Sequence, residues 1–289
     1  KNLNGLWQYK IHKSERMPQA YQGDILVPFP MESALSGVQR LLEPDEMLWY
    51  RRMFQHQTAK GHRTHLHFEA VDYECTVYLN GVKIGSHQGS SDPFNFDITD
   101  ALHPGDNELI VSVIDKTAAS QTLGKQSLKP KGIYYTRVSG IWQTVWLEDV
   151  PDRHFRMVKM KPRIAEGTLR VLPTLEGKPL KAERIVITVR DGDRVVGVAD
   201  AALSVRIPNA KLWSPQNPNL YEITMELFDG EALIDRVESY AAMRSSIRLM
   251  EDGSVADGVQ VRRSLELATQ VWGPLLSRQR DGGRGSTED

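Results

Sequence analysis

The nine residues at positions 139–147 constrain the fold of this chain more strongly than any other stretch. One set of alternate positions holds Ile141, Gln143, Val145 and Leu147, and the other holds Trp142, Thr144 and Trp146. This period of two predicts a β-strand with large side chains on both faces. A buried aromatic side chain removes about 150–250 Å² from water, so the face that carries both tryptophans needs a broad surface to pack against. We therefore expect the closing strand of a β-sandwich.

The size and charge of the chain exclude several classes of partner. A length of 289 residues suits one large or two medium domains, and 36 basic against 37 acidic residues leave a net charge of −1. No overall field then steers the protein towards nucleic acid or an anionic membrane, and we expect neither as a partner. No apolar run approaches the ~20 residues that span a bilayer, and no signal-like segment opens the chain. We expect a soluble protein, cytoplasmic or exported with its signal removed.

The residues that could carry thiol or metal chemistry favour simpler interpretations. Cys75 is the single cysteine and lies in an alternating apolar segment, so we expect a buried, inert thiol. His62, His65 and His67 have a spacing that a metal could use in a strand. No cysteine or carboxylate accompanies them at a diagnostic spacing, which favours ordinary strand histidines. We predict neither a metal nor a cofactor.

Several stretches upstream of the closing strand resemble one family. They are the "VPFP" of residues 27–30 with Glu32-Ser33, the "WYRRMF" of residues 49–54, and residues 71–81 and 92–99. Together with residues 139–147 they resemble the sugar-binding domain of glycoside hydrolase family 2, the family of β-galactosidases, β-glucuronidases and β-mannosidases. The resemblance implies a jelly-roll, galactose-binding-like sandwich. Within it, Asn80-Gly81 lies between two apolar runs and predicts a type I′ hairpin turn.

A second domain is expected after Pro151. Residues 185–190 and 194–198 are short apolar runs that flank an Asp-Gly-Asp turn, which is typical of a second sandwich. Residues 212–221 read LWSPQNPNLY and resemble the "LWSPENPxLY" element in the immunoglobulin-like domain of the family. We predict an all-β protein with a jelly roll over residues 1–150, an immunoglobulin-like sandwich over 152–247, and a linker remnant and tail over 248–289. Helical spacing in the tail predicts one short helix, through Val261, Leu265, Ala268, Trp272 and Leu275.

The best candidate for carbohydrate contact is the long connection over residues 116–138. Connections longer than about 12–15 residues are usually functional, and this one gathers side chains that can stack on sugar rings or bind hydroxyls. The candidate sugar-binding residues are Lys125, Gln126, Tyr134, Tyr135 and Arg137, together with Asp92 from a separate turn. In relatives whose sandwich touches substrate, an Asp stands where Tyr134 stands here. The alternative is a loop that only docks another domain.

The resemblance implies chemistry that residues 1–289 are not expected to perform alone. Family 2 enzymes use two barrel glutamates with carboxyl groups roughly 5–5.5 Å apart. A barrel needs about 250 residues, whereas 42 follow position 247. We therefore expect the non-catalytic sandwich portion of a family 2 enzyme that acts on a β-glycoside, with no catalytic residue of its own, as a fragment, a truncated gene product or a split subunit.

Two alternative functions stay open. The expected protein partners follow from the missing barrel. One alternative is a free-standing, lectin-like carbohydrate-binding module. The other is a glycosidase with an unconventional active site on the sandwich, built from carboxylates such as Asp92 and Asp97. Surface meant for a barrel would favour self-association or a barrel-containing partner.

Overall fold

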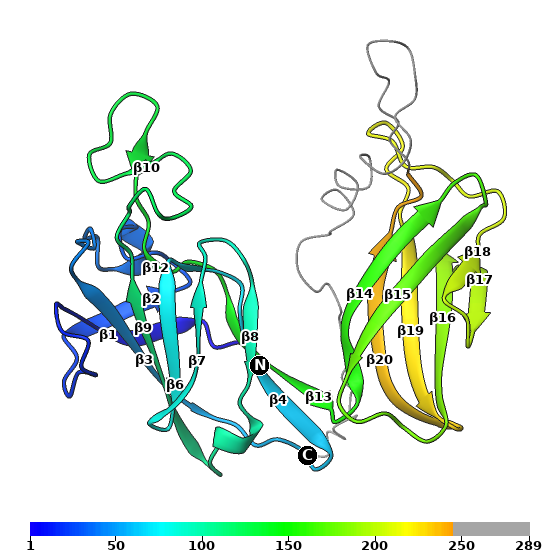
Figure 1. Ribbon diagram of the computed structural model, residues 1–289, viewed down its shortest axis with the longest axis horizontal. Helices are drawn as coiled ribbons and strands as arrows, with labels where there is room; N and C mark the ends of the chain where they lie inside the picture. The colour runs from blue at the N-terminus through cyan, green and yellow to red at the C-terminus, as the bar shows by residue number, and fades with distance from the viewer. Residues whose placement is uncertain (245–289) are drawn as a thin grey trace, which may run out of the picture. The chain divides into compact units, whose positions relative to one another are not determined.

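The computed structural model describes residues 1–244, and all of its extended secondary structure is β (Figure 1). Within these residues there are twenty strands and two single-turn 3₁₀ helices, η1 (Ala34–Ser36) and η2 (Thr99–Ala101). None of the described residues belongs to a helix long and apolar enough to cross a membrane. The chain separates into two compact units, Lys1–Val150 and a second that begins at Pro151. The predicted tail helix lies outside the described residues.

The larger layer of the first unit is a six-stranded antiparallel sheet with the order β2-β1-β3-β9-β6-β7. Along each strand, alternate residues point to the inner face of the sheet, and these residues are mostly apolar. Strands from distant parts of the sequence therefore share one buried surface. Its strands are β1 (Gly5–His12), β2 (Gly23–Val27), β3 (Met47–Gln55), β6 (Glu74–Leu79), β7 (Val82–Gln88) and β9 (Asp106–Ile114).

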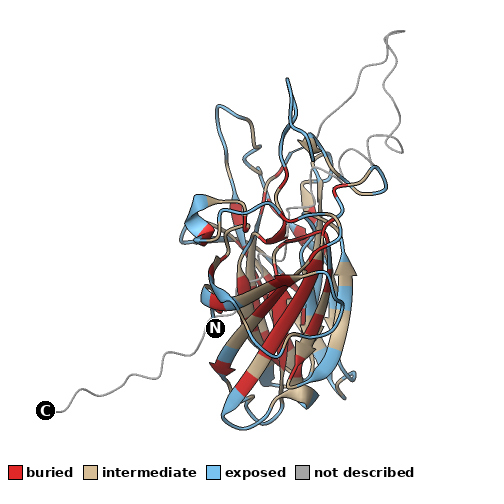
Figure 2. Cartoon of the chain, turned by 90° about the vertical axis from the view of Figure 1, so that its left-hand side faces the viewer, coloured by how far each residue is buried: buried red, intermediate tan, exposed pale blue. Residues whose placement is uncertain are grey.

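The opposite layer is shorter and comes in two pieces. Strands β13 (Val145–Pro151), β4 (His62–Phe68) and β8 (Phe94–Asp97) form one sheet, and β5 (Val71–Asp72) pairs with β12 (Gly140–Ile141). The two layers enclose a continuous core, drawn in red in Figure 2, whose fully buried members include Trp7, Tyr50, Leu66, Phe68, Val77 and Val145. This arrangement confirms the predicted sandwich.

The closing segment is two strands rather than the single strand that its alternation predicted. Ile141 pairs with Val71 in β12, whereas Val145 begins β13 beside β4. Between them residues 142–144 belong to neither strand, and the Trp142 indole Nε1 donates a hydrogen bond to the Ser90 carbonyl over 2.7 Å. Ile141, Val145 and Leu147 are buried in the same core, but Gln143 is exposed at the break, so the alternation of burial is interrupted there.

The Asn80-Gly81 hairpin is confirmed. Asn80 and Gly81 have φ angles of 51° and 80°, and they join β6 to β7 as a type I′ turn requires. The side-chain Nδ2 of Asn80 also donates to the Ala101 carbonyl and to Asn107 Oδ1, both over 2.8 Å. The turn is therefore held by its own backbone preference and by half-buried side-chain hydrogen bonds.

The second unit is a smaller sandwich of three and four antiparallel strands. One sheet has the order β14-β15-β18 and the other has the order β17-β16-β19-β20, as an immunoglobulin-like domain requires. A separate core fills it, with Phe155, Val171, Val189, Ile223 and Val237 fully buried. The strands are β14 (His154–Arg163), β15 (Thr168–Glu176), β16 (Glu183–Asp191), β17 (Arg194–Asp200), β18 (Ser204–Arg206), β19 (Tyr221–Asp229) and β20 (Ala232–Ala241).

The proline-rich element at 212–221 closes one end of that sandwich. The Trp213 amide donates to the Met243 carbonyl over 3.0 Å, and Ser214 and Asn217 exchange two backbone hydrogen bonds. The Tyr221 hydroxyl accepts from the Lys211 amide over 2.6 Å. The turn is thus tied at both ends before it enters β19, so this element has a structural role.

Candidate carbohydrate site

The connection between β9 and β12, residues 116–138, is here called the site loop. It stands out from the end of the first sandwich (Figure 1), and a short parallel bridge braces it internally, between β10 (Gln126–Ser127) and β11 (Tyr135–Thr136). A loop of this length loses much conformational entropy when it is ordered, so its base must be held by strong contacts. Three sets of buried or half-buried polar contacts hold it.

The first contact joins the two ends of the site loop through Asp115. This side chain is 3% exposed, and its Oδ2 accepts a hydrogen bond from the Ser139 hydroxyl over 2.8 Å. Its Oδ1 accepts from the Thr117 amide over 2.9 Å and from Gln121 Nε2 over 3.2 Å. One carboxyl group therefore fixes the first turn of the site loop against Ser139, the residue that follows the loop.

The second contact is made by Gln126, one of the predicted sugar-binding residues. Its Nε2 donates to Asp72 Oδ2 over 3.1 Å, and its Oε1 accepts from the Val138 amide over 2.6 Å. Both ends of the side-chain amide are thus engaged within the protein. The geometry favours a positioning role for Gln126, because the amide links the middle of the site loop to β5 and to its own C-terminal end.

The third contact is Arg137, which was also predicted to bind sugar. Its side chain is 3% exposed, and Nε and Nη2 donate to the Leu42 carbonyl over 3.0 and 2.7 Å. Nη2 also lies 3.3 Å from Glu43 Oε1. The guanidinium points into the protein and links the site loop to the segment before β3. The geometry therefore favours a role for Arg137 in positioning the site loop.

Three carboxyl groups, Glu32, Asp72 and Asp115, lie under the base of the site loop and are here called the carboxyl cluster. Burial, reinforced by the charges of Asp115 and Glu32, raises the pKa of Asp72 to about 7, against the donation from Gln126. Burial also raises the pKa of Glu32, although the Ser139 amide donates to its Oε2 over 2.9 Å. Glu32 and Asp72 therefore sit in surroundings of low polarity, where these two carboxyl groups retain a proton more easily than in water.

The remaining candidates on the site loop face solvent. Tyr134 and Tyr135 are 53% and 54% exposed, and Lys125 is exposed beside them. The Lys125 carbonyl accepts from the Tyr135 amide over 3.0 Å, which fixes these two residues next to each other. Two phenol rings and an ammonium group are thus available to a ligand on a braced surface.

Asp92 lies apart from this constellation. It is exposed in the turn before β8, and no hydrogen bond joins it to the site loop in the part of the chain that is described. Its charge acts on His87, whose pKa is lowered by burial in spite of the opposing effect of Asp92. Asp97, the other carboxylate considered from the sequence, is committed to Arg63 and the Thr99 hydroxyl, which help to lower its pKa.

The histidines of β4 support a structural interpretation. The His67 ring stacks on Trp146 at 4.1 Å between centroids, and its Nε2 lies 3.0 Å from Glu148 Oε2. His65 Nδ1 lies 3.3 Å from Asn95 Oδ1. Among residues 1–244, no group of three or more His, Cys, Asp or Glu side chains is arranged to hold a metal ion.

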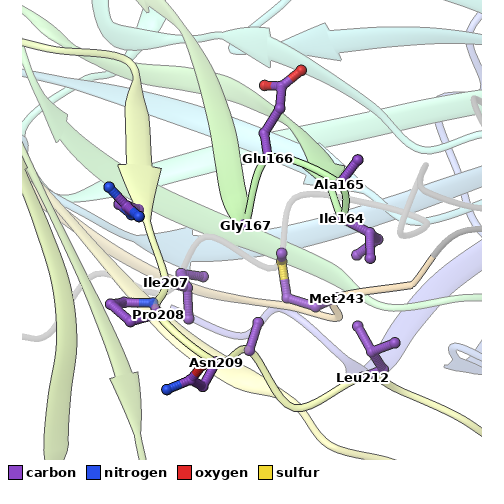
Figure 3. A pocket seen from close by; sticks show the side chains of 11 residues that line it. Ile164, Ala165, Glu166, Gly167, Ile207, Pro208, Asn209, Leu212 and Met243 are labelled. Atoms are coloured by element: carbon purple, nitrogen blue, oxygen red, sulfur yellow. The ribbon is translucent and has the colours of Figure 1, made fainter.

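The second unit has a concavity of about 450 Å³ that carries little chemistry (Figure 3). Apolar residues, among them Ile164, Leu212 and Met243, line it together with the polar residues Arg206 and Asn209. Glu166 lies at its edge and forms an exposed ion pair with Arg163 over 2.9 Å. The site loop of the first unit therefore remains the better candidate for ligand contact.

Comparison with models of known protein families shows to which family the chain is related. Residues 27–151 match the model described as "Glycosyl hydrolases family 2, sugar binding domain", and residues 163–244 match the model described as "Glycosyl hydrolases family 2". The chain belongs to glycoside hydrolase family 2. Its two units correspond to these two matched regions, so the resemblance inferred from the motifs is confirmed.

Individual relatives within family 2 are considerably longer than this chain. A β-galactosidase from Thermoanaerobacter pseudethanolicus is 26% identical over 224 residues, which are 71% of this chain and 29% of the relative. A β-galactosidase large subunit from Leuconostoc lactis is 26% identical over 87% of this chain and 47% of its own length. The chain thus spans less than half of these curated relatives.

Solved structures of family 2 enzymes share the fold. An FMN-binding β-glucuronidase from Facaelibacterium prausnitzii superposes with a TM-score of 0.68 at 25% identity, covering 88% of this chain and 40% of that one. The β-glucuronidase of Ruminococcus gnavus gives 0.69 at 19% identity over 86% of this chain. The all-β pair of sandwiches is therefore a known arrangement of this family.

Sequence reasoning missed the carboxyl cluster, although each member had a visible signal. Glu32 lies in the "ES" pair that resembles the family, Asp72 interrupts an apolar run, and Asp115 directly follows the apolar strand β9. A carboxylate at the end of a buried strand is a candidate for a buried hydrogen-bonding role. What no local pattern gives is that the three meet at one place.

Proposed function

We propose that this chain is the carbohydrate-binding sandwich portion of a family 2 β-glycosidase, and that O-glycosyl hydrolysis by the whole protein uses carboxylates outside residues 1–244. The observation that carries the proposal is the site loop, a long connection whose base is fixed by buried and half-buried polar contacts while Lys125, Tyr134 and Tyr135 face solvent. Rigid presentation of aromatic rings lowers the entropy lost on binding a flexible glycan.

The proposal assigns different roles to the candidate residues. Tyr134 and Tyr135 stack on sugar rings and Lys125 donates to ligand oxygens, because these three side chains are exposed. Gln126 and Arg137 position the site loop, since their polar groups are engaged within the protein. Hydrolysis is assigned elsewhere because a retaining glycosidase needs two carboxyl groups on either side of an accessible bond, whereas Asp72 and Asp115 are each 3% exposed.

The test has two parts. The purified chain is titrated with a panel of β-linked oligosaccharides, and binding is measured by calorimetry. The same chain is assayed for hydrolysis of nitrophenyl β-galactoside, β-glucuronide and β-mannoside. The proposal expects binding that weakens in Tyr134→Ala and in Tyr135→Ala, with no turnover in the range of about 1–10³ s⁻¹ that is typical of enzymes. Thr122→Ala, at another exposed position of the site loop, is the matched control.

Two alternatives give different results in the same experiment. A free-standing lectin binds glycans tightly and has no barrel partner, so its affinity is unchanged when a family 2 barrel is supplied in trans. An enzyme built on the sandwich shows turnover that co-purifies with the wild-type chain and is lost in Asp92→Ala. Either outcome would replace the present assignment.

A further inference from the structure

The outer surface of the site loop carries positive charge that the rest of the chain does not share. Residues 116–138 contain five cationic side chains and no Asp or Glu, although the whole chain has a net charge of −1. The guanidinium of Arg137 is buried against Leu42 and Glu43. The other four cations are exposed and form no ion pair within residues 1–244, and they are Lys116, Lys125, Lys129 and Lys131.

The site loop also has no carboxylate oxygen and no free side-chain amide oxygen that could accept a hydrogen bond from a ligand. Its two amide side chains are consumed internally, because Gln121 Oε1 accepts from the Ala118 amide over 2.7 Å and Gln126 Oε1 accepts from the Val138 amide over 2.6 Å. Ammonium groups donate hydrogen bonds and accept none. What the site loop offers outward is therefore a set of donors, weakly supplemented by hydroxyl groups.

This imbalance distinguishes between classes of sugar. A neutral sugar presents hydroxyl groups that both donate and accept, so a protein that recognises it needs carboxylate or amide acceptors as well as donors. A sugar that bears carboxylate or sulfate groups presents acceptors in excess and a negative charge. Charged hydrogen bonds between ammonium and carboxylate groups are about twice as strong as neutral ones.

We propose that the site loop binds an acidic glycan, a chain of sugars that bear carboxylate or sulfate groups, through its exposed lysines together with Tyr134 and Tyr135. This inference rests on the proposed function, in which the site loop contacts carbohydrate, and it names the class of that carbohydrate. The lysines neutralise the anionic groups and the tyrosines stack on the sugar rings between them. The 42% exposed Leu128 and the 71% exposed Ile133 extend the apolar part of this surface.

The experiment compares an acidic glycan with its uncharged ester and with a glycan whose charge is sulfate, using the full chain. A β-linked tetraglucuronate, its tetramethyl ester and a sulfated β-galactan tetrasaccharide are titrated calorimetrically at several salt concentrations. Wild-type protein is expected to bind the acid, or the sulfated chain, at least about tenfold more tightly than the ester, with affinity that falls as salt rises. The acid and the sulfated chain distinguish the two sources of negative charge.

Matched variants test the residues. Lys129→Glu with Lys131→Glu is expected to weaken binding of the acid by about tenfold, because two exposed charge contacts become repulsive. Lys60→Glu with Lys83→Glu changes the net charge equally at exposed positions of the same unit but outside the site loop, and is expected to leave affinity within about twofold. Tyr134→Ala with Tyr135→Ala weakens glycan binding without affecting binding of inorganic polyphosphate.

The outcomes separate this inference from the proposed function. Equal or tighter binding of the methyl ester would overturn the acidic specificity and leave carbohydrate contact by the site loop intact. Absence of binding by every glycan, in a protein whose circular dichroism spectrum is unchanged, would overturn both. Equal affinity for the acid, polyphosphate and a DNA oligonucleotide, insensitive to the tyrosine variants, would show unspecific charge attraction and would also overturn it.

Discussion

The side-chain amide of Gln126 donates a hydrogen bond to Oδ2 of Asp72 over 3.1 Å, across 54 positions of the sequence. Asp72 is 3% exposed and lies among the other members of the carboxyl cluster, Glu32 and Asp115. The site loop is thus anchored on a carboxyl group whose protonation the surrounding protein controls. Stability of the first unit should consequently depend on pH through this group.

Asp72→Asn is expected to flatten that pH dependence. The pKa of Asp72 is about 7 in the folded chain, against an ordinary value of 3.8, mainly because burial disfavours its charge. Its contribution to stability is complete below about pH 4 and is lost as the pH rises towards 7, because only the unfolded chain has then released the proton. At about 1.4 kcal/mol for each unit of pKa, the loss amounts to ~4 kcal/mol.

Urea unfolding of both proteins between pH 4 and pH 8, followed by tryptophan fluorescence, measures the difference. The free energy of unfolding of the wild type should fall relative to that of Asp72→Asn across this range. Asp92→Asn removes an exposed carboxylate and controls for the change in net charge. Parallel curves for the wild type and Asp72→Asn would contradict the expected proton retention.

Arg137→Met should lower the free energy of unfolding by about 2–4 kcal/mol. The substitution keeps apolar volume but removes both donors to the buried Leu42 carbonyl, which is then left without its partner. Lys60→Ala, at an exposed position of the same unit, should change stability by no more than about 0.5 kcal/mol. A change of that small size in Arg137→Met, measured by chemical unfolding, would show that the buried guanidinium contributes no net stability.

Gly140→Ala should be strongly destabilising, by at least about 3 kcal/mol. Gly140 has a φ of 90°, and a Cβ there would overlap the hydroxyl of Tyr50, a side chain that is fully buried and cannot withdraw. Gly105→Ala is the matched control, because its φ is 91° and its Cβ would meet open space, so that only the backbone strain of about 1 kcal/mol remains.

A double variant identifies the Gly140 clash. Tyr50→Phe removes the hydroxyl that accepts from the Ile141 amide over 3.1 Å and should be mildly destabilising alone. Combined with Gly140→Ala it should recover part of the lost stability, giving a non-additive cycle. Strict additivity in the double-mutant cycle would assign the loss to backbone strain alone.

Cys75 should react with a disulfide reagent only when the first unit opens. Its thiol is 3% exposed, and burial raises its pKa to about 12, so very little of the reactive thiolate forms near neutral pH. Because Cys75 is the single cysteine of the chain, the absorbance of the thiolate that the reagent releases reports the reaction of this one site. Ser91→Cys in a Cys75→Ala background supplies an exposed thiol that should react at once. Equally fast labelling of native Cys75 would mean that the strand β6 is accessible.

The sequence alone determined the class of fold, because strand alternation and turn chemistry are local properties. Asn80-Gly81 takes two positive φ values that few other pairs adopt without strain, so its hairpin could be predicted from two residues. The same local pattern failed at residues 139–147. Ile141, Val145 and Leu147 are buried as the alternation predicted, but Gln143 is exposed where the chain passes from one sheet to another. Alternation does not record which neighbour a strand pairs with.

Only the tertiary structure decided which polar residues of the first unit meet. The length and composition of residues 116–138 predicted a surface loop, yet they could not show that Arg137 turns inward while Tyr134 and Tyr135 stay outside. Glu32, Asp72 and Asp115 are separated by dozens of residues and act on one another only because distant strands close over the same core. Burial sets the pKa of Asp72, and burial is a property of the assembled sandwich that no stretch of sequence carries by itself.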